Sequence, residues 1–235
     1  MTIRGILFDK DGTLFDYHQT WMPLNHQAAL TATRGDQTLA HSLLESGGWD
    51  AASNRVASGS LLAACNNHEI AENWADYVGG WDVDDLAKII TDQFTEGGVR
   101  SAVPVTALDP FLTELRNQGY KLGVATSDSE AGATGMLKRF DVLDHLDFVS
   151  GYDSGHGSKP QPGMVYAFCK NCEIEPGEAI MVGDNWHDVE TGRNAGVPFT
   201  VGVLTGTSTR EELEDVADHV LDSVEEISAL LASLS

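Results

Sequence analysis

The chain has few basic residues. Against 36 Asp and Glu it carries 14 Lys and Arg, which gives a formal net charge of -22 over 235 residues. Such a surplus of negative charge repels phosphate backbones and anionic lipid surfaces at long range. We therefore expect neither a nucleic-acid partner nor a membrane partner, and a lysine that lies within a motif is more informative than usual.

Cysteine is also scarce, and the three in the chain are Cys65, Cys169 and Cys172. An odd number in a chain of this length argues against a disulfide framework. Cys169 and Cys172 have the spacing of a redox pair, but they lie in an apolar run typical of a helix, where thiols pack as small hydrophobic groups. No second pair of ligands completes a zinc site, so none is expected.

Long hydrophobic runs are missing as well. No stretch of about 18 apolar residues is present, so no membrane-spanning helix is predicted. Residues 1–4 lead into the first apolar segment without a signal-peptide pattern. With 42% hydrophobic and 21% charged residues, the composition is that of an ordinary globular protein, and we expect it to be cytoplasmic.

The apolar run at residues 6–8 predicts a buried strand, and it ends in Asp9 and Asp11, followed by Gly12 and Thr13. At the carboxyl end of a strand in an open α/β sheet, both carboxylates would lie where such sheets hold ligands. Two anions this close need a cation, a shared proton or a bound electrophile. Mg²⁺ held by carboxylates and a substrate phosphate fits best, although a simple turn could use the same residues.

Two kinds of periodicity divide the rest of the chain. Between residues 15 and 98, apolar residues recur mostly at helical spacing; helices are predicted near residues 21–33, 38–45, 69–78 and 83–94, with a loop at 47–55. From residue 99 onward, helices alternate with short apolar strands at residues 120–125, 147–149, 179–182 and 199–203. This pattern predicts an α/β fold. Residues 1–14 and 99–235 would form a doubly wound parallel sheet, and residues 15–98 an inserted helical cap domain.

Polar side chains follow three of these later segments. Thr126 and Ser127 end the strand at 120–125, where hydroxyls and free amides could bind a phosphate or simply cap the next helix. Lys159 stands at a predicted helix start, an electrostatically unfavourable place that implies an anion nearby. Asp184 and Asp188 lie one helical turn apart after the strand at 179–182, and both can face a cation.

The motifs Asp-x-Asp-Gly-Thr-Leu at 9–14, the hydroxyl at Thr126, Lys-Pro-x-Pro at 159–162 and Gly-Asp-x-x-x-Asp at 183–188 resemble, in this order, the four motifs of the haloacid dehalogenase-like hydrolase superfamily. The resemblance implies a Rossmann-like core. The position of the insert is similar to that of phosphoglycolate phosphatases with a small helical cap.

The resemblance also implies an activity and its residues. Mg²⁺ would be held by Asp9, Asp11 through its backbone carbonyl, Asp184 and Asp188. The expected function is Mg²⁺-dependent hydrolysis of a small phosphomonoester, of the phosphoglycolate or sugar phosphate type, through an aspartyl phosphate on the first of these residues. Asp11 would act as general acid and base. Thr126 and Lys159 would hold the phosphoryl oxygens, with Gly12, Thr13 and Ser127 also contacting the substrate.

Other functions are built on some or all of these four motifs. Dehalogenases of the superfamily lack an acid at the position of Asp11, which disfavours dehalogenation. A sugar-phosphate mutase of the β-phosphoglucomutase type would share every core motif and stays open, and a non-catalytic phospho-ligand binding protein is expected to have lost one. Within the insert, Asn54 and Arg55 are candidates for contacting the leaving group, although plain solvent exposure is the more common situation of an isolated loop arginine.

Overall fold

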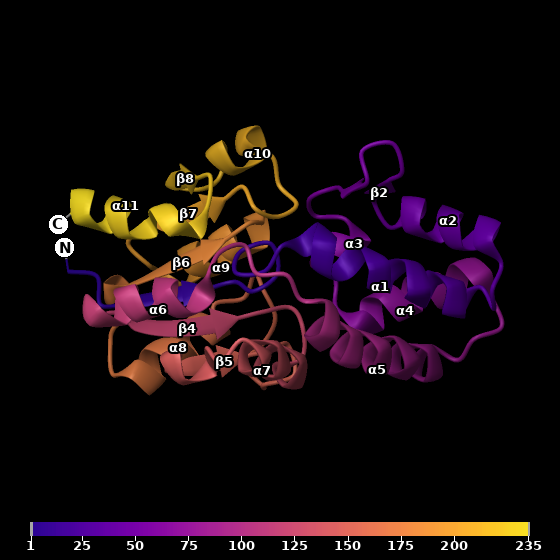
Figure 1. The fold of residues 1–235 in the computed structure, drawn as a ribbon, viewed down its shortest axis with the longest axis horizontal. Coiled ribbons are helices and arrows are strands. Elements are labelled where there is room, and N and C mark those ends of the chain that lie inside the picture. The colour runs from indigo at the N-terminus through magenta and orange to yellow at the C-terminus, as the bar shows by residue number, and fades with distance from the viewer. Residues whose placement is uncertain (1, 235) are drawn as a thin grey trace.

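The computed structural model describes residues 2–234. Within these residues, six strands form one parallel sheet in the order β5-β4-β1-β6-β7-β8 (Figure 1). The strands are β1 (Gly5–Phe8), β4 (Lys121–Ala125), β5 (Phe148–Ser150), β6 (Ala179–Gly183), β7 (Thr200–Val203) and β8 (His219–Leu221). The predicted fold class is confirmed. β1 lies between β4 and β6, and the strand order runs outward from it in both directions. In such a sheet, ligands bind in the crevice beyond the carboxyl ends of the strands at this point of reversal.

The sheet is covered on both faces. Side chains alternate along a strand, so Ile6 and Phe8 belong to one hydrophobic cluster and Leu7 to another. The first cluster includes residues of α6 (Leu108–Asn117), α7 (Glu130–Arg139) and α11 (Ile227–Ser233). The second includes residues of α8 (Gly163–Cys172) and α9 (Trp186–Ala195), with Cys169 and Cys172 among them as free thiols. Burial on both faces explains why the β1 sequence is apolar without interruption.

The chain between β1 and α6 is mainly helical. Its helices are α1 (Tyr17–Ala32), α2 (Gln37–Ser46), α3 (Leu61–Ala64), α4 (Asn67–Val78) and α5 (Val83–Ser101). Figure 1 shows them at the end of the molecule opposite the two termini. The segment predicted as a loop at 47–55 forms a short hairpin instead, with β2 (Trp49–Asp50) paired to β3 (Arg55–Val56). The rings of Trp49 and His26 pack edge to face, with 4.7 Å between their centroids, a tertiary contact that the local sequence does not reveal.

Helix α5 is longer than predicted. It was predicted over residues 83–94, but it continues through Gly97 and Gly98 to Ser101. A Cβ at Gly98 would lie 3.1 Å from the Trp21 ring, and one at Gly97 would collide with Leu24. The two glycines therefore allow α5 to pack closely on α1, and this packing offsets their low helix propensity.

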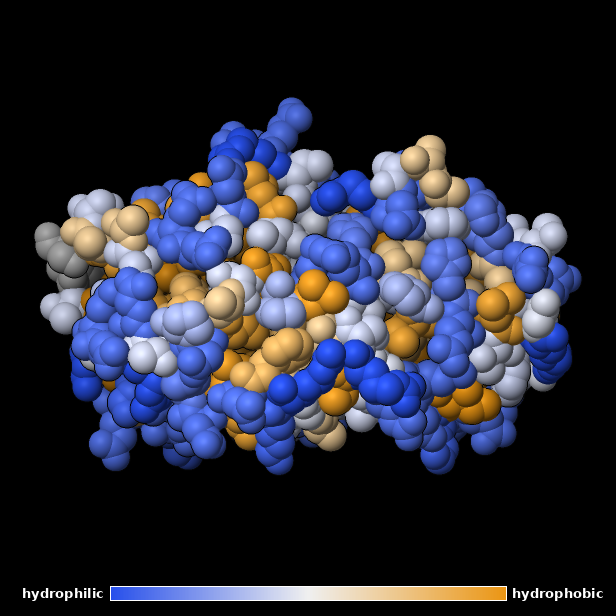
Figure 2. All heavy atoms as spheres, viewed as in Figure 1, coloured by the Kyte–Doolittle hydropathy of each residue, from blue (hydrophilic) through white to orange (hydrophobic). Residues whose placement is uncertain are grey.

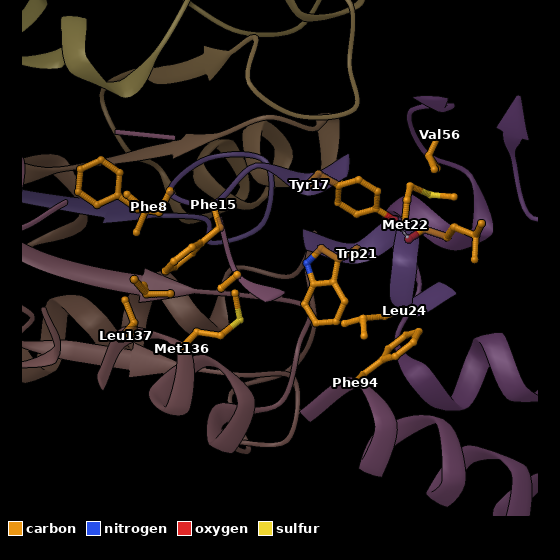
Figure 3. Packing of buried hydrophobic residues seen from close by; sticks show 14 of the residues in the cluster. Phe8, Phe15, Tyr17, Trp21, Met22, Leu24, Val56, Phe94, Met136 and Leu137 are labelled. Carbon is orange, nitrogen blue, oxygen red and sulfur yellow. Dashed lines mark hydrogen bonds between the residues drawn. The ribbon is translucent and has the colours of Figure 1, made fainter. Parts of the chain in front are cut away.

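Hydrophobic packing continues from the sheet into these helices. Figure 3 shows Phe15, Met136 and Leu137 on the sheet side, facing Trp21 and Phe94 across the junction. Hydrophilic residues cover most of the surface seen in Figure 2, as the acidic composition suggests. No helix within residues 2–234 is both long and apolar enough to cross a membrane.

Candidate active site

The residues predicted to carry chemistry meet at the carboxyl edge of the sheet. Asp9 follows β1, Thr126 follows β4 and Asp184 follows β6, and all three are buried. Together with Asp11, Ser127, Asp128, Lys159 and Asp188 they line one cavity of about 90 Å³. Parallel strands place their carboxyl ends at the same edge, which is why residues more than a hundred positions apart converge here.

Three carboxylates form the acidic part of this cavity. Oxygens of Asp9, Asp184 and Asp188 all lie within 4.8 Å of one another. Burial, followed by the negative charges of Asp9 and Asp188, raises the pKa of Asp184 well above its ordinary value. Asp184 also accepts hydrogen bonds from the backbone N–H and hydroxyl of Thr207, at 2.7 and 3.1 Å. A set of buried carboxylate oxygens at this spacing fits a hard divalent cation such as Mg²⁺.

Lys159 joins the first and last motifs. Its Nζ lies 2.5 Å from Asp9 Oδ1 and 2.6 Å from Asp188 Oδ1. Burial would lower the pKa of Lys159, but Asp188 and Asp9 outweigh it and hold that pKa above its ordinary value, so the ammonium keeps its charge. Burial raises the pKa of Asp9 to about 6, although Lys159 opposes the shift. One lysine thus faces three carboxylates, and a negative charge remains for a cation to neutralise.

Asp11 has a different set of partners. Its Oδ1 accepts hydrogen bonds from Trp21 Nε1 at 2.7 Å and from Lys10 Nζ at 2.9 Å. Lys10 is fully buried, and its Nζ forms a second ion pair with Asp128 at 3.0 Å. Burial raises the pKa of Asp11 to about 6, with Lys10 opposing that shift. The carboxylate of Asp11 is therefore held by the buried Lys10 ammonium and by the Trp21 indole of α1.

Sequence reasoning missed Lys10, Trp21 and Thr207. A lysine at the end of a buried strand, between two carboxylates, is a usable signal for Lys10, because a buried cation needs an anionic partner. Trp21 offers no such signal, since an aromatic residue in an amphipathic helix usually packs in a core. Thr207 lies in a loop whose path depends on the packing of β7 and α10 (Arg210–Glu214).

The loop after β1 is shaped around the acidic cluster. Gly12 has a φ of +91°, and a Cβ there would lie 2.6 Å from Asp184 Cγ. Thr13 is fully buried, and its hydroxyl has no hydrogen-bond partner among the described residues. The hydroxyl of Thr126 accepts from the backbone N–H of Asp128 at 3.1 Å, so its proton is free for a ligand.

Asn54 and Arg55 do not lie where the sequence suggested. Neither lines the cavity, and both are exposed. Asn54 Oδ1 accepts from Trp49 Nε1 at 3.0 Å, and Arg55 donates to the Gly206 carbonyl at 3.1 Å. These contacts hold Asn54 within the hairpin and join Arg55 to the loop that precedes Thr207. The insert reaches the cavity through other residues, which include Tyr17, Trp21, Asn25, Leu62, Cys65, Asn67, Ile70 and Phe94.

Comparison with known proteins agrees with this geometry. A family model described as haloacid dehalogenase-like hydrolase matches residues 6–202. Pyrophosphatase PpaX from Bacillus mycoides is 32% identical over 125 residues, which are 53% of this chain and 58% of the relative. The chain thus spans less than two thirds of the length of that relative.

Solved structures match over nearly the whole chain. A putative phosphatase from Clostridium difficile has a TM-score of 0.74 at 20% identity and covers 98% of this chain and 99% of its own. A putative beta-phosphoglucomutase from Thermotoga maritima has a TM-score of 0.71 at 18% identity, with coverage of 99% and 100%. At this level of identity the likeness shows a shared fold.

Proposed function

The chain belongs to the haloacid dehalogenase-like hydrolase family, and from its site we propose that it is a Mg²⁺-dependent phosphatase acting on a small phosphomonoester. The observation that carries the proposal is the buried cluster in which Lys159 bridges Asp9 and Asp188 while Asp184 completes the acidic trio. Phosphoryl transfer requires positioning and charge neutralisation. A fixed ammonium beside a divalent-cation site offers both.

We assign the nucleophile to Asp9. Its carboxylate would attack phosphorus in line, and the bond from phosphorus to the leaving alcohol would break to give an aspartyl phosphate. Asp11 would donate its proton to the departing oxygen and then accept a proton from the water that attacks the phosphorus of this intermediate. That second step releases phosphate, restores the Asp9 carboxylate and returns Asp11 to its protonated form. The raised pKa of Asp11, about 6, supports a group that exchanges its proton near neutral pH.

The remaining residues would hold the phosphate. Lys159 and Thr126 are buried around the cavity, and Ser127 lines it; we propose that they contact the phosphoryl oxygens. Gly12 and Thr13 would contribute the loop after β1. Mg²⁺ held by the acidic trio and the Asp11 backbone carbonyl would reduce the repulsion between an anionic nucleophile and an anionic phosphate.

We further propose that residues 15–98 act as a cap that selects the substrate. Sequence resemblance favours a phosphoglycolate or sugar phosphate type of substrate. The arrangement of α1 to α5 over the cavity supports the selecting role, because the core residues described above can contact only the phosphate.

The test is release of inorganic phosphate from para-nitrophenyl phosphate, with Mg²⁺ and with EDTA. Asp9→Asn should lose at least about 1000-fold in rate, since it removes the nucleophile. Asp92→Asn, which changes an exposed carboxylate on α5 paired with Lys88, is the matched control and should keep wild-type rates. Equal rates for the two variants would remove Asp9 from the mechanism. Isomerisation of a hexose 1-phosphate faster than phosphate release would identify a mutase instead.

A further inference from the structure

The part of the cavity that faces the insert is built from uncharged side chains. Trp21, Leu62, Ile70 and Phe94 supply aromatic and aliphatic surface, and Asn25 and Asn67 supply amides. A phosphate bound beside Lys159 would direct its leaving alcohol toward these residues. The chemistry of this surface therefore indicates what kind of alcohol the site accepts.

The lysines in and beneath the cavity are already paired with aspartates. Among the described residues that line the cavity, Lys159 is the one Lys or Arg, and it is bound to Asp9 and Asp188. The neighbouring Lys10 is fully buried beneath the cavity and forms ion pairs with Asp11 and Asp128. Within residues 2–234, the cavity lining therefore offers no further ammonium or guanidinium to pair with a second anionic group on the substrate.

The lining also repels such a group. Asp11 and Asp128 line the cavity beside the uncharged surface, and a carboxylate or second phosphate on the alcohol would have to approach them. His187 lines the same cavity, with Nδ1 3.2 Å from Asn185 Oδ1. A neutral imidazole with its proton on Nδ1 satisfies this contact. Lys10 carries one positive charge against the two carboxylates of Asp11 and Asp128, so no counter-ion is left for a further anion, and like charges placed together in this way cost several kcal/mol at an interface.

The amides can recognise hydroxyl groups. Asn67 Nδ2 donates to Thr91 Oγ1 at 3.3 Å, which leaves its amide oxygen available to accept a hydrogen bond. The hydroxyl of Tyr17 is committed, since it donates to the Leu62 carbonyl at 2.5 Å. The surface thus combines hydrocarbon contact with a neutral hydrogen-bond acceptor.

We infer that the substrate is the phosphate monoester of a small uncharged alcohol bearing hydroxyl and hydrocarbon groups, and that phosphoglycolate and pyrophosphate are poor substrates. This inference rests on the proposed phosphatase activity and narrows its substrate class. It departs from the sequence resemblance to phosphoglycolate phosphatases and from the name of the related pyrophosphatase, because both phosphoglycolate and pyrophosphate carry a second anionic group.

The test compares substrates matched in size. Wild-type protein with Mg²⁺ is assayed by phosphate release on 2-hydroxyethyl phosphate and on 2-phosphoglycolate, which differ by a hydroxymethyl against a carboxylate. Glycerol 1-phosphate and 3-phosphoglycerate form a second pair, and pyrophosphate is assayed beside them. In each pair the uncharged alcohol should have the higher kcat/KM, by about 10-fold or more.

A charge introduced into the surface should reverse part of this preference. Ala64 lines the cavity and is half-buried at the end of α3, so it can accept a longer side chain. Ala64→Lys should reduce the preference for 2-hydroxyethyl phosphate over 2-phosphoglycolate by about 10-fold, as expected for a new ion pair. Ala64→Gln adds similar bulk without charge and should leave the ratio near its wild-type value.

The outcomes are distinct. Para-nitrophenyl phosphate is assayed first, and absence of any Mg²⁺-dependent phosphate release would overturn the proposed phosphatase function together with this inference. Activity on para-nitrophenyl phosphate, with kcat/KM for 2-phosphoglycolate or pyrophosphate at or above that for 2-hydroxyethyl phosphate, would overturn the inference alone. An equal ratio of kcat/KM for 2-hydroxyethyl phosphate to kcat/KM for 2-phosphoglycolate in Ala64→Lys and Ala64→Gln would also contradict it. The charge of the insert surface would then have no effect on substrate preference.

Discussion

Trp21→Phe tests whether the insert holds the general acid in position. The substitution keeps an aromatic ring in the packed junction with Phe94 (5.4 Å between centroids) and removes the indole N–H that donates to Asp11 Oδ1 at 2.7 Å. Figure 3 shows the indole nitrogen on the side of the ring that faces the sheet. Asp11 would then be held by Lys10 alone.

The size of the effect follows from that contact. A hydrogen bond to a charged group contributes about 1.5–3 kcal/mol, and each ~1.4 kcal/mol in a barrier is a factor of ten in rate. Lys10 still contacts both oxygens of Asp11, at 2.9 and 2.7 Å, so the carboxylate stays close to its place. We therefore expect the lower end, a loss of about 10-fold.

The assay separates positioning of Asp11 from general damage by varying the leaving group. The value of kcat/KM reports steps up to release of the leaving group. An alkyl alcohol needs a proton from Asp11 to leave, whereas para-nitrophenolate leaves readily without one. Trp21→Phe should lower kcat/KM about 10-fold for 2-hydroxyethyl phosphate and by less than about 3-fold for para-nitrophenyl phosphate.

Trp74→Phe is the matched control. Trp74 is fully buried in α4, and its Nε1 has no hydrogen-bond partner among residues 2–234. The control removes the same atoms from the insert without touching Asp11, so both substrates should keep wild-type kcat/KM. An equal loss for both substrates in Trp21→Phe, or no loss for either, would refute the positioning of Asp11 by α1.

Three further results are expected. Asp184→Asn should raise the Mg²⁺ concentration needed for half-maximal activity by at least about 10-fold, measured by titration with Mg²⁺. The same variant should have a higher melting temperature in EDTA, because it removes a buried negative charge. A lower melting temperature would contradict this interpretation. In EDTA the wild-type free energy of unfolding should rise as pH falls from about 7 to about 5, since the pKa of Asp9 is raised to about 6 and the folded state then binds more protons than the unfolded state; chemical denaturation at each pH, with Asp9→Asn showing a smaller rise, checks it. Gly12→Ala should cost more stability than Gly35→Ala by about 1–3 kcal/mol, because both have φ near +90° but only Gly12 faces Asp184 while Gly35 has open space; equal costs in chemical denaturation would show that the loop shifts freely.

The sequence by itself determined the architecture and the motif residues. An apolar strand that ends in two carboxylates is a local pattern. The apolar run of α8 and the strand followed by Asp184 are local patterns too. Because parallel strands share one carboxyl edge, the order of these local patterns was enough to predict which side chains meet there.

Tertiary structure decided the features that depend on contacts between distant segments. Only packing against α1 lets α5 run through Gly97 and Gly98, and only the β2–β3 hairpin brings Arg55 to the Gly206 carbonyl. The same packing brings Trp21 to Asp11 and lines the insert side of the cavity with uncharged residues. Local spacing fixes which face of an element a residue occupies, but the partner of that face is set by how helices and sheet close on one another. The edge where the motif residues meet could therefore be predicted from the sequence, whereas the part of the cavity lining that the insert supplies could not.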